Sequence, residues 1–133
     1  MKHILKLLMK KNFLGKKWIF DKIFDDIEIY EKLKHLRERL ESRYKIKLSL
    51  WERWTLIKTQ IIILLKDNNC WEKCLKKNPY QKSFTIHLTD SNIYVSGIIQ
   101  NDLDESCQRI YFSTFLPKDP SINPNDLKFD LSL

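Results

Sequence analysis

The sequence predicts an α+β domain in which N-terminal helices pack on a small antiparallel sheet of about three strands. Two observations predict this class. Apolar residues recur at helical spacing before Pro79, and beyond it they alternate with polar residues as in half-buried strands. The chain has 133 residues, of which 43% are hydrophobic and 31% charged, enough for one domain with a modest core. We therefore expect a single domain over residues 1–133.

Four segments follow from these patterns. Residues 1–30 are predicted to form a basic helical extension, because the first 20 residues carry six lysines and no acid. We expect residues 31–78 to form a helical body, residues 79–117 the antiparallel sheet, and residues 118–133 an extended tail. The proline-containing tail shows no strong periodicity.

The helical body starts with an apolar stripe at helical spacing, made of Leu33, Leu36, Leu40 and Tyr44. Beside it, His35, Arg39 and Arg43 are each four residues apart and should line one edge of the helix. An imidazole and two guanidiniums in a row suit the binding of phosphate. The alternative is a solvated basic edge paired with Glu38 and Glu41.

Local signals define the elements that follow. Ser49 and Glu52 form a capping box, which predicts a helix from Leu50 to about Lys66. Alternation predicts strands at about 83–89, 93–100 and 108–116. Gly97 falls inside the second of these strands and indicates a bulge or a close approach of two backbones.

The formal net charge of +7 favours an anionic partner. Residues 32–82 contribute 14 basic against 5 acidic side chains, so the helical body carries the excess. The three cysteines are odd in number and lack zinc-site spacing, which predicts reduced thiols and no metal. We expect no cofactor and a cytoplasmic location. We also expect no stable membrane insertion, because the apolar run Ile61–Leu65 is too short to span a bilayer.

Candidate chemical groups lie in both halves of the chain. The predicted helix supplies His35, Arg39 and Arg43. The predicted strands supply His87, Arg109, Tyr111, Ser113 and Thr114. Cleavage of RNA by its own 2′-hydroxyl needs a group that takes a proton, a group that returns one, and cations around the phosphorane. Histidine and arginine supply these functions without a metal.

Each candidate also has a structural explanation. His87 on a half-buried strand can be a hydrogen-bonded structural residue, and Arg109 can pair with Asp102 or Asp104. The tryptophans at positions 51, 54 and 71 fit the core better than a base-stacking platform.

The run from His35 to Leu48, reading HLRERLESRYKIKL, and the strand Arg109–Pro117 resemble segments of small phage and mobile-element proteins. Such proteins are similar to the superfamily of metal-independent ribonucleases that includes barnase, the tRNA-cleaving colicins and RelE-type toxins. The resemblance spans about residues 33–117. In that superfamily helix and sheet residues together form the phosphate site, which implies roles there for His35, Arg39, Arg43 and Thr114. Lys45 stands where such proteins usually have glycine, which leaves an inactive relative or an inhibitor open.

Three functions therefore remain as hypotheses. The first is a toxin-like, metal-independent endoribonuclease, with His35, Arg39, His87 and Thr114 catalytic and Arg43, Arg109, Tyr111 and Ser113 binding the RNA. The second is a non-catalytic phage or mobile-element module that binds nucleic acid or a host protein. A toxin neutraliser is the third, although such proteins are commonly acidic. The partners we expect are RNA and, for a toxin, a cognate antitoxin or a host protein.

Overall fold

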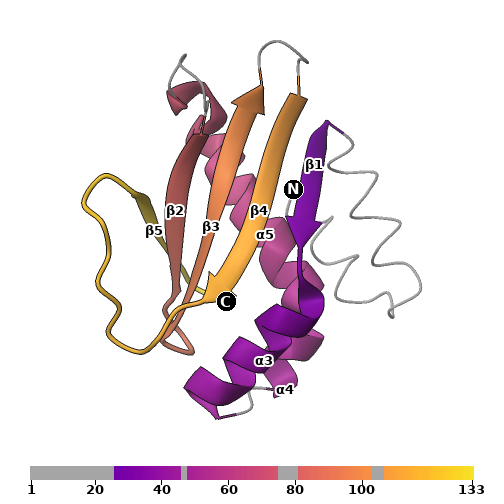
Figure 1. Cartoon of the computed structure of the whole chain (residues 1–133), viewed down its shortest axis with the longest axis vertical. Coiled ribbons are helices and arrows are strands. Elements are labelled where there is room, and N and C mark those ends of the chain that lie inside the picture. The colour runs from indigo at the N-terminus through magenta and orange to yellow at the C-terminus, as the bar shows by residue number, and fades with distance from the viewer. Residues whose placement is uncertain (1–25, 46–47, 75–80, 103–106) are drawn as a thin grey trace.

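The computed structural model describes residues 26–45, 48–74, 81–102 and 107–133 (Figure 1). The described strands are β1 (Ile27–Glu31), β2 (Gln81–Leu88), β3 (Ile93–Asp102), β4 (Cys107–Phe115) and β5 (Leu127–Leu131). The described α-helices are α3 (Leu33–Tyr44), α4 (Leu48–Glu52) and α5 (Trp54–Asp67), followed by a short 3-10 helix, η1 (Trp71–Lys73). The chain is therefore α+β.

The predicted sheet of three antiparallel strands is wrong, because the sheet has five strands and is mixed. Its order is β1-β4-β3-β2-β5. The three inner strands β4, β3 and β2 are antiparallel, as predicted, whereas β1 runs parallel to β4 and β5 runs parallel to β2. The helices α3, α4 and α5 follow β1 in the chain, so the described part does not begin with helices.

Both missed strands are short segments with strict alternation. β1 reads IEIYE, and its Ile27 and Ile29 pack toward the core while Glu28 and Tyr30 point away. β5 reads LKFDL and alternates in the same way inside the predicted tail. Each strand lies at an edge of the sheet, where parallel pairing to a strand distant in sequence holds it in place.

Helix α5 covers one face of the sheet and supplies much of the core (Figure 1). The Trp54 ring packs edge-on against Phe112 and Phe115 of β4, with centroids 5.4 and 5.3 Å apart. Trp71 of η1 is also buried, and its indole donates to the Arg109 carbonyl at 3.0 Å. These two tryptophans are core residues, as predicted.

The prediction of one continuous helix over Leu50–Lys66 is wrong. The helix is divided at Arg53, whose N–H donates to the Leu50 carbonyl at 3.0 Å, as in a tight turn. Ser49 lies inside α4, and no side-chain cap is found at the start of α5. The break separates Trp51 from Trp54 by a turn, and their rings stack at 6.4 Å.

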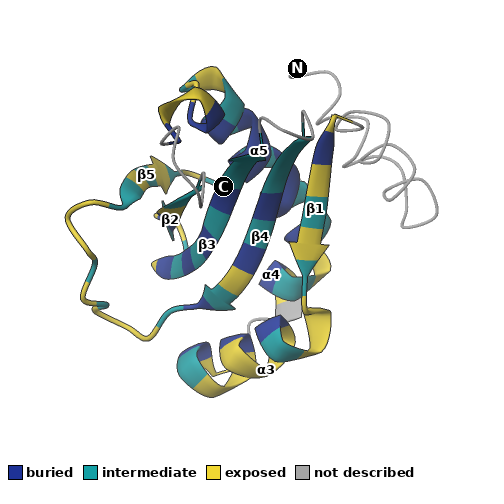
Figure 2. Ribbon diagram, turned by 45° about the horizontal axis from the view of Figure 1, so that its top comes forward, coloured by how far each residue is buried: buried dark blue, intermediate teal, exposed yellow. Residues whose placement is uncertain are grey.

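Helix α3 crosses the end of the sheet where β1 and β4 finish (Figure 1). Its C-terminal turn is fixed there by two long-range hydrogen bonds. The Arg43 guanidinium donates to the Phe115 carbonyl at 2.7 Å, and the Tyr44 hydroxyl donates to the Leu116 carbonyl at 2.6 Å. Burial of Tyr44 raises the pKa of its hydroxyl, so it remains a donor at neutral pH. Figure 2 shows that the side of α3 away from the sheet is exposed.

The prediction for Gly97 is confirmed. A Cβ atom at this position would collide with the Tyr111 carbonyl oxygen and the Phe84 ring. The register also shifts here, because Ser96 pairs with Thr114 and Gly97 pairs with Phe112. Ser113 is thus an extra, bulged residue on β4.

The remaining expectations divide by region. The helical extension lies outside the described residues except for its end, where β1 shows that residues 27–30 are a strand. Cys70, Cys74 and Cys107 form no disulfide in the described part. Within the described part, no helix is long and apolar enough to cross a membrane, and no group of three or more potential ligands could hold a metal.

Candidate functional site

The face of the sheet opposite α5, here called the outer face, carries the candidate groups. Alternation along β4 sends Ile110 and Phe112 into the core and Arg109, Tyr111 and Ser113 to the outer face. No described helix covers this face (Figures 1 and 2). Tyr30 and Ser113 are exposed on it.

Two tyrosines form an aromatic stack on the outer face. Tyr30 of β1 and Tyr111 of β4 are register partners, and their rings lie nearly parallel, 13° apart, with centroids separated by 4.8 Å. Tyr30 is 41% exposed, so part of the stack faces solvent. The Tyr30 hydroxyl donates to Glu28 at 2.5 Å, which orients the ring and raises the pKa of the tyrosine.

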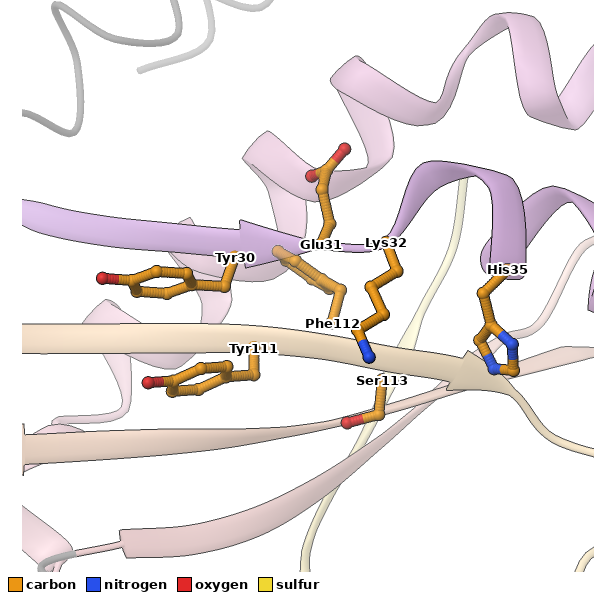
Figure 3. A pocket seen from close by; sticks show the side chains of 7 residues that line it. All are labelled: Tyr30, Glu31, Lys32, His35, Tyr111, Phe112 and Ser113. Atoms are coloured by element: carbon orange, nitrogen blue, oxygen red, sulfur yellow. The ribbon is translucent and has the colours of Figure 1, made fainter.

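A pocket of about 480 Å³ begins at this stack. It is here called the tyrosine pocket and is lined by Tyr30, Glu31, Lys32, His35, Tyr111, Phe112 and Ser113. In Figure 3 the tyrosine rings lie at one end and His35 at the other, with Lys32 between them and its amine directed toward β4 at Ser113. The pocket thus combines a π surface with basic groups.

The basic groups of the pocket come from the start of α3. Lys32 is the residue before the helix, and His35 lies in its first turn. Among the described residues, neither side chain has a hydrogen bond or an ion pair. The first turn holds no acid and no side-chain cap, so the helix dipole adds partial positive charge there. An anion entering this end meets uncompensated positive charge.

Among the described residues, Glu31 is the one acid that lines the pocket, and Lys58 of α5 pairs with it. The Lys58 ammonium donates to both carboxylate oxygens, at 2.7 and 2.8 Å. The side chains are only 11% and 13% exposed. The carboxylate therefore does not cancel the charge of Lys32.

The rest of the predicted helical row continues along the same edge of α3. Arg39 is exposed, and its side chain has no partner among the residues that the structure describes. The predicted pairing of this row with Glu38 and Glu41 is not seen in the described part, where Glu41 pairs with Arg37 at 3.4 Å instead. Arg43 is held by the Phe115 carbonyl, so it has a structural role at the end of β4.

The structure brings His35, Tyr111 and Ser113 to one pocket, but not the other predicted groups. Thr114 pairs with Ser96 beside the bulge, and its hydroxyl donates to the Phe115 carbonyl at 3.4 Å. It lines neither the tyrosine pocket nor any other described pocket.

His87 lies elsewhere on the outer face. It stacks on Tyr94 with centroids 4.4 Å apart, and its Nε2 is 2.7 Å from the Asn92 side-chain oxygen. Its Nδ1 is 3.4 Å from Asp130 of β5. These contacts match the structural explanation, and they place His87 on β2, separated from β4 by β3.

Arg109 is held by acids, as the alternative explanation predicted for Asp102. Its guanidinium lies 3.4 Å from Asp102 and 3.7 Å from Glu28. Hydrogen bonds from Cys107 and Tyr30, together with this guanidinium, lower the pKa of Glu28. Arg109 thus belongs to a charge cluster at the opposite end of β4 from α3.

Sequence reasoning missed Tyr30 and Lys32. The alternation of IEIYE was the available signal, because it would have placed Tyr30 on a strand face. Which residue Tyr30 meets depends on the parallel pairing of β1 with β4, which no local pattern predicts.

Comparison with models of protein families, with curated proteins and with solved structures found no match for this chain. The resemblance of residues 33–117 to metal-independent ribonucleases therefore stays a prediction.

Proposed function

We propose that this protein binds single-stranded RNA on the outer face of its sheet. The observation that carries the proposal is the exposed Tyr30–Tyr111 stack beside Lys32 and His35 in one pocket. Aromatic side chains on a sheet can stack unpaired bases, and adjacent cations hold the phosphates. The charge of the rim supports this, since residues 32–45 carry six basic and two acidic side chains.

The test is the affinity of a fluorescein-labelled RNA octamer, measured by anisotropy for the wild type and two pairs of variants. Tyr111→Ala should weaken binding roughly tenfold, because stacking contributes about 1–3 kcal/mol per base. Tyr94→Ala is its matched control, an outer-face tyrosine of the His87 stack that does not line the tyrosine pocket. A Tyr111→Ala protein that binds as tightly as the wild type would contradict the proposal.

Salt dependence tests the phosphate contacts. Each lost phosphate contact should reduce the slope of log affinity against log salt by about 0.7 for a single strand. Lys32→Ala should show this reduction, and Lys34→Ala, which lies on α3 outside the pocket, should not. If the affinity stays the same between about 50 and about 200 mM salt, the protein does not bind the RNA through its phosphates.

RNA cleavage is a second candidate, favoured by the imidazole of His35, which lines the pocket and has no hydrogen bond or ion pair with any described residue. In this reaction His35 takes the proton of a 2′-hydroxyl, the 2′-oxygen attacks phosphorus, and the bond to the 5′-oxygen breaks. The leaving oxygen takes a proton from water, and Lys32 and Arg39 supply positive charge for the phosphorane. The reaction needs no metal.

A further inference from the structure

A second pocket on the outer face adjoins the tyrosine pocket. It has a volume of about 270 Å³ and shares Ser113 with the first. It is here called the serine pocket and is lined by Ser83, Phe84, Thr85, Ser96, Gly97, Ile98, Ser113, Leu116, Ser121, Ile122 and Asp126. Residues 116–126, which connect β4 to β5, form one wall. The shared serine makes the two pockets neighbours along β4.

The lining of the serine pocket is rich in hydroxyl groups, and one of them belongs to Thr85, a residue that is almost fully buried. Thr85 is only 4% exposed, and it faces the outer side because Phe84 and Ile86 enter the core. No hydrogen bond to its hydroxyl is found among the described residues. The hydroxyl is not one of the buried unpaired atoms of the described part, so it is open to the pocket and can bond a ligand there.

The chemistry of the lining fits a nucleoside better than a phosphate. Serine and threonine hydroxyls both donate and accept, which matches a ribose 2′-hydroxyl and the edge of a base. Ile98 and Ile122 offer apolar contact to a ring. Of the described residues that line it, Asp126 alone is charged; its carboxylate would repel a phosphate but can accept from a hydroxyl or an amino group.

We infer that the serine pocket is a second nucleotide subsite, which receives the sugar and base of the nucleotide next to the one stacked on the tyrosines. This inference rests on the proposed function and adds to it a preference for RNA over DNA and for single strands over duplexes. A duplex keeps its bases paired and stacked, so it cannot place one base at the stack and its neighbour in the pocket.

Two substitutions test the subsite in the full chain, with the same RNA octamer. Ser83 is exposed, so Ser83→Leu fills the pocket from the solvent side without entering the core. We expect it to weaken binding about tenfold, a loss expected when an ordered contact is replaced by an obstruction. Ser49→Leu, at an exposed serine of α4 outside the described pockets, should bind like the wild type.

Thr85→Val is the second variant, because it removes the hydroxyl and keeps the shape. It should lower RNA affinity about fivefold, the effect of one hydrogen bond, while the melting temperature stays equal or rises. A DNA octamer of the same sequence should bind the wild type more weakly and should lose less with this variant. If Ser83→Leu fails to fold, Thr85→Val decides alone.

The outcomes separate the two proposals. If Tyr111→Ala weakens binding while Ser83→Leu and Thr85→Val do not, the second subsite is wrong and RNA binding at the tyrosine pocket stands. If the wild type binds no RNA, the proposed function fails and the subsite fails with it. Equal affinity for the RNA and DNA octamers would overturn the ribose contact.

Discussion

Lys58 and Glu31 form an ion pair that is almost out of solvent, with the ammonium 2.7 and 2.8 Å from the two carboxylate oxygens. The pair joins α5 to the end of β1, immediately before Lys32. It therefore fixes the strand end from which Lys32 enters the tyrosine pocket, and it removes a negative charge from the pocket lining.

Breaking this pair should be costly. Lys58→Met leaves the Glu31 carboxylate buried and unpaired, so we expect a loss of about 3–5 kcal/mol in the free energy of unfolding, measured with urea. Adding Glu31→Leu should recover most of the loss, because the remaining charge is removed as well. Lys66→Met is the control on the same helix, since the Lys66–Asp26 pair is exposed and should contribute less than about 1 kcal/mol. Equal losses for the two lysine variants would contradict this account.

The close contact at Gly97 predicts strong intolerance to substitution. Gly97→Ala places a methyl group against the Tyr111 carbonyl and the Phe84 ring, so we expect a destabilisation of about 1–3 kcal/mol or more from overpacking. The neighbouring Ser96→Ala, which removes a hydroxyl from the outer face, should change the urea midpoint only slightly. An alanine at position 97 with wild-type stability would mean that β3 and β4 are less closely paired than the structure shows.

The cysteines should differ in reactivity. Burial raises the pKa of Cys74 to about 11, and burial also raises that of Cys70, so both stay protonated and shielded at pH 8. Iodoacetamide should therefore modify Cys107, which is partly exposed, well before the other two. Mass spectrometry of the alkylated protein checks the order, and rapid labelling of Cys74 in the folded state would contradict it.

The same pKa shift predicts a loss of stability in alkali. The folded-state pKa of Cys74 lies above its ordinary value of 9.0, so its burial is compatible with full stability below pH 9. Between pH 9 and about 11 the unfolded chain ionises first, and stability falls as pH rises. Cys74→Ala should flatten this part of the curve of unfolding free energy against pH.

If the protein cleaves RNA, His35→Ala should lower the rate on the order of 10²–10⁴-fold, the usual contribution of a general base. The product should be a 2′,3′-cyclic phosphate, and the rate should not change in a chelator. His87→Ala distinguishes two assignments. If His87 is catalytic, as the sequence predicts, the cleavage rate should fall. If only the residues of the tyrosine pocket act, the rate should stay at the wild-type value, because His87 lies elsewhere on the sheet.

The inner part of the sheet could be predicted from sequence because β2, β3 and β4 are long and alternate clearly. The edge strands could not, because five alternating residues such as those around Ile29 also fit the end of a helix pattern. The continuous helix predicted from the capping box at Ser49 was wrong for a related reason. A local signal gives a preference of a few tenths to about 2 kcal/mol, which the packing of Trp54 on β4 overrides.

The candidate site could likewise be predicted only in part. Helical spacing placed His35 correctly on the edge of α3, and alternation placed Tyr111 and Ser113 on one face of a strand. The face of His87 was also predictable, but its distance from His35 was not, because that distance depends on the order of the strands. The parallel pairing that brings Tyr30 to Tyr111 is likewise a property of the whole fold.

This pairing has a consequence for synthesis of the protein. Tyr30 and Tyr111 meet only through β1 and β4, and α3, α4, α5, β2 and β3 all lie between them in the chain. Contacts between segments so distant in sequence form slowly, because the intervening chain must first be ordered. On a ribosome β1 emerges early and has no partner until β4 has been made. The proposed RNA-binding surface therefore assembles late, and a nascent chain truncated before β4 would lack it.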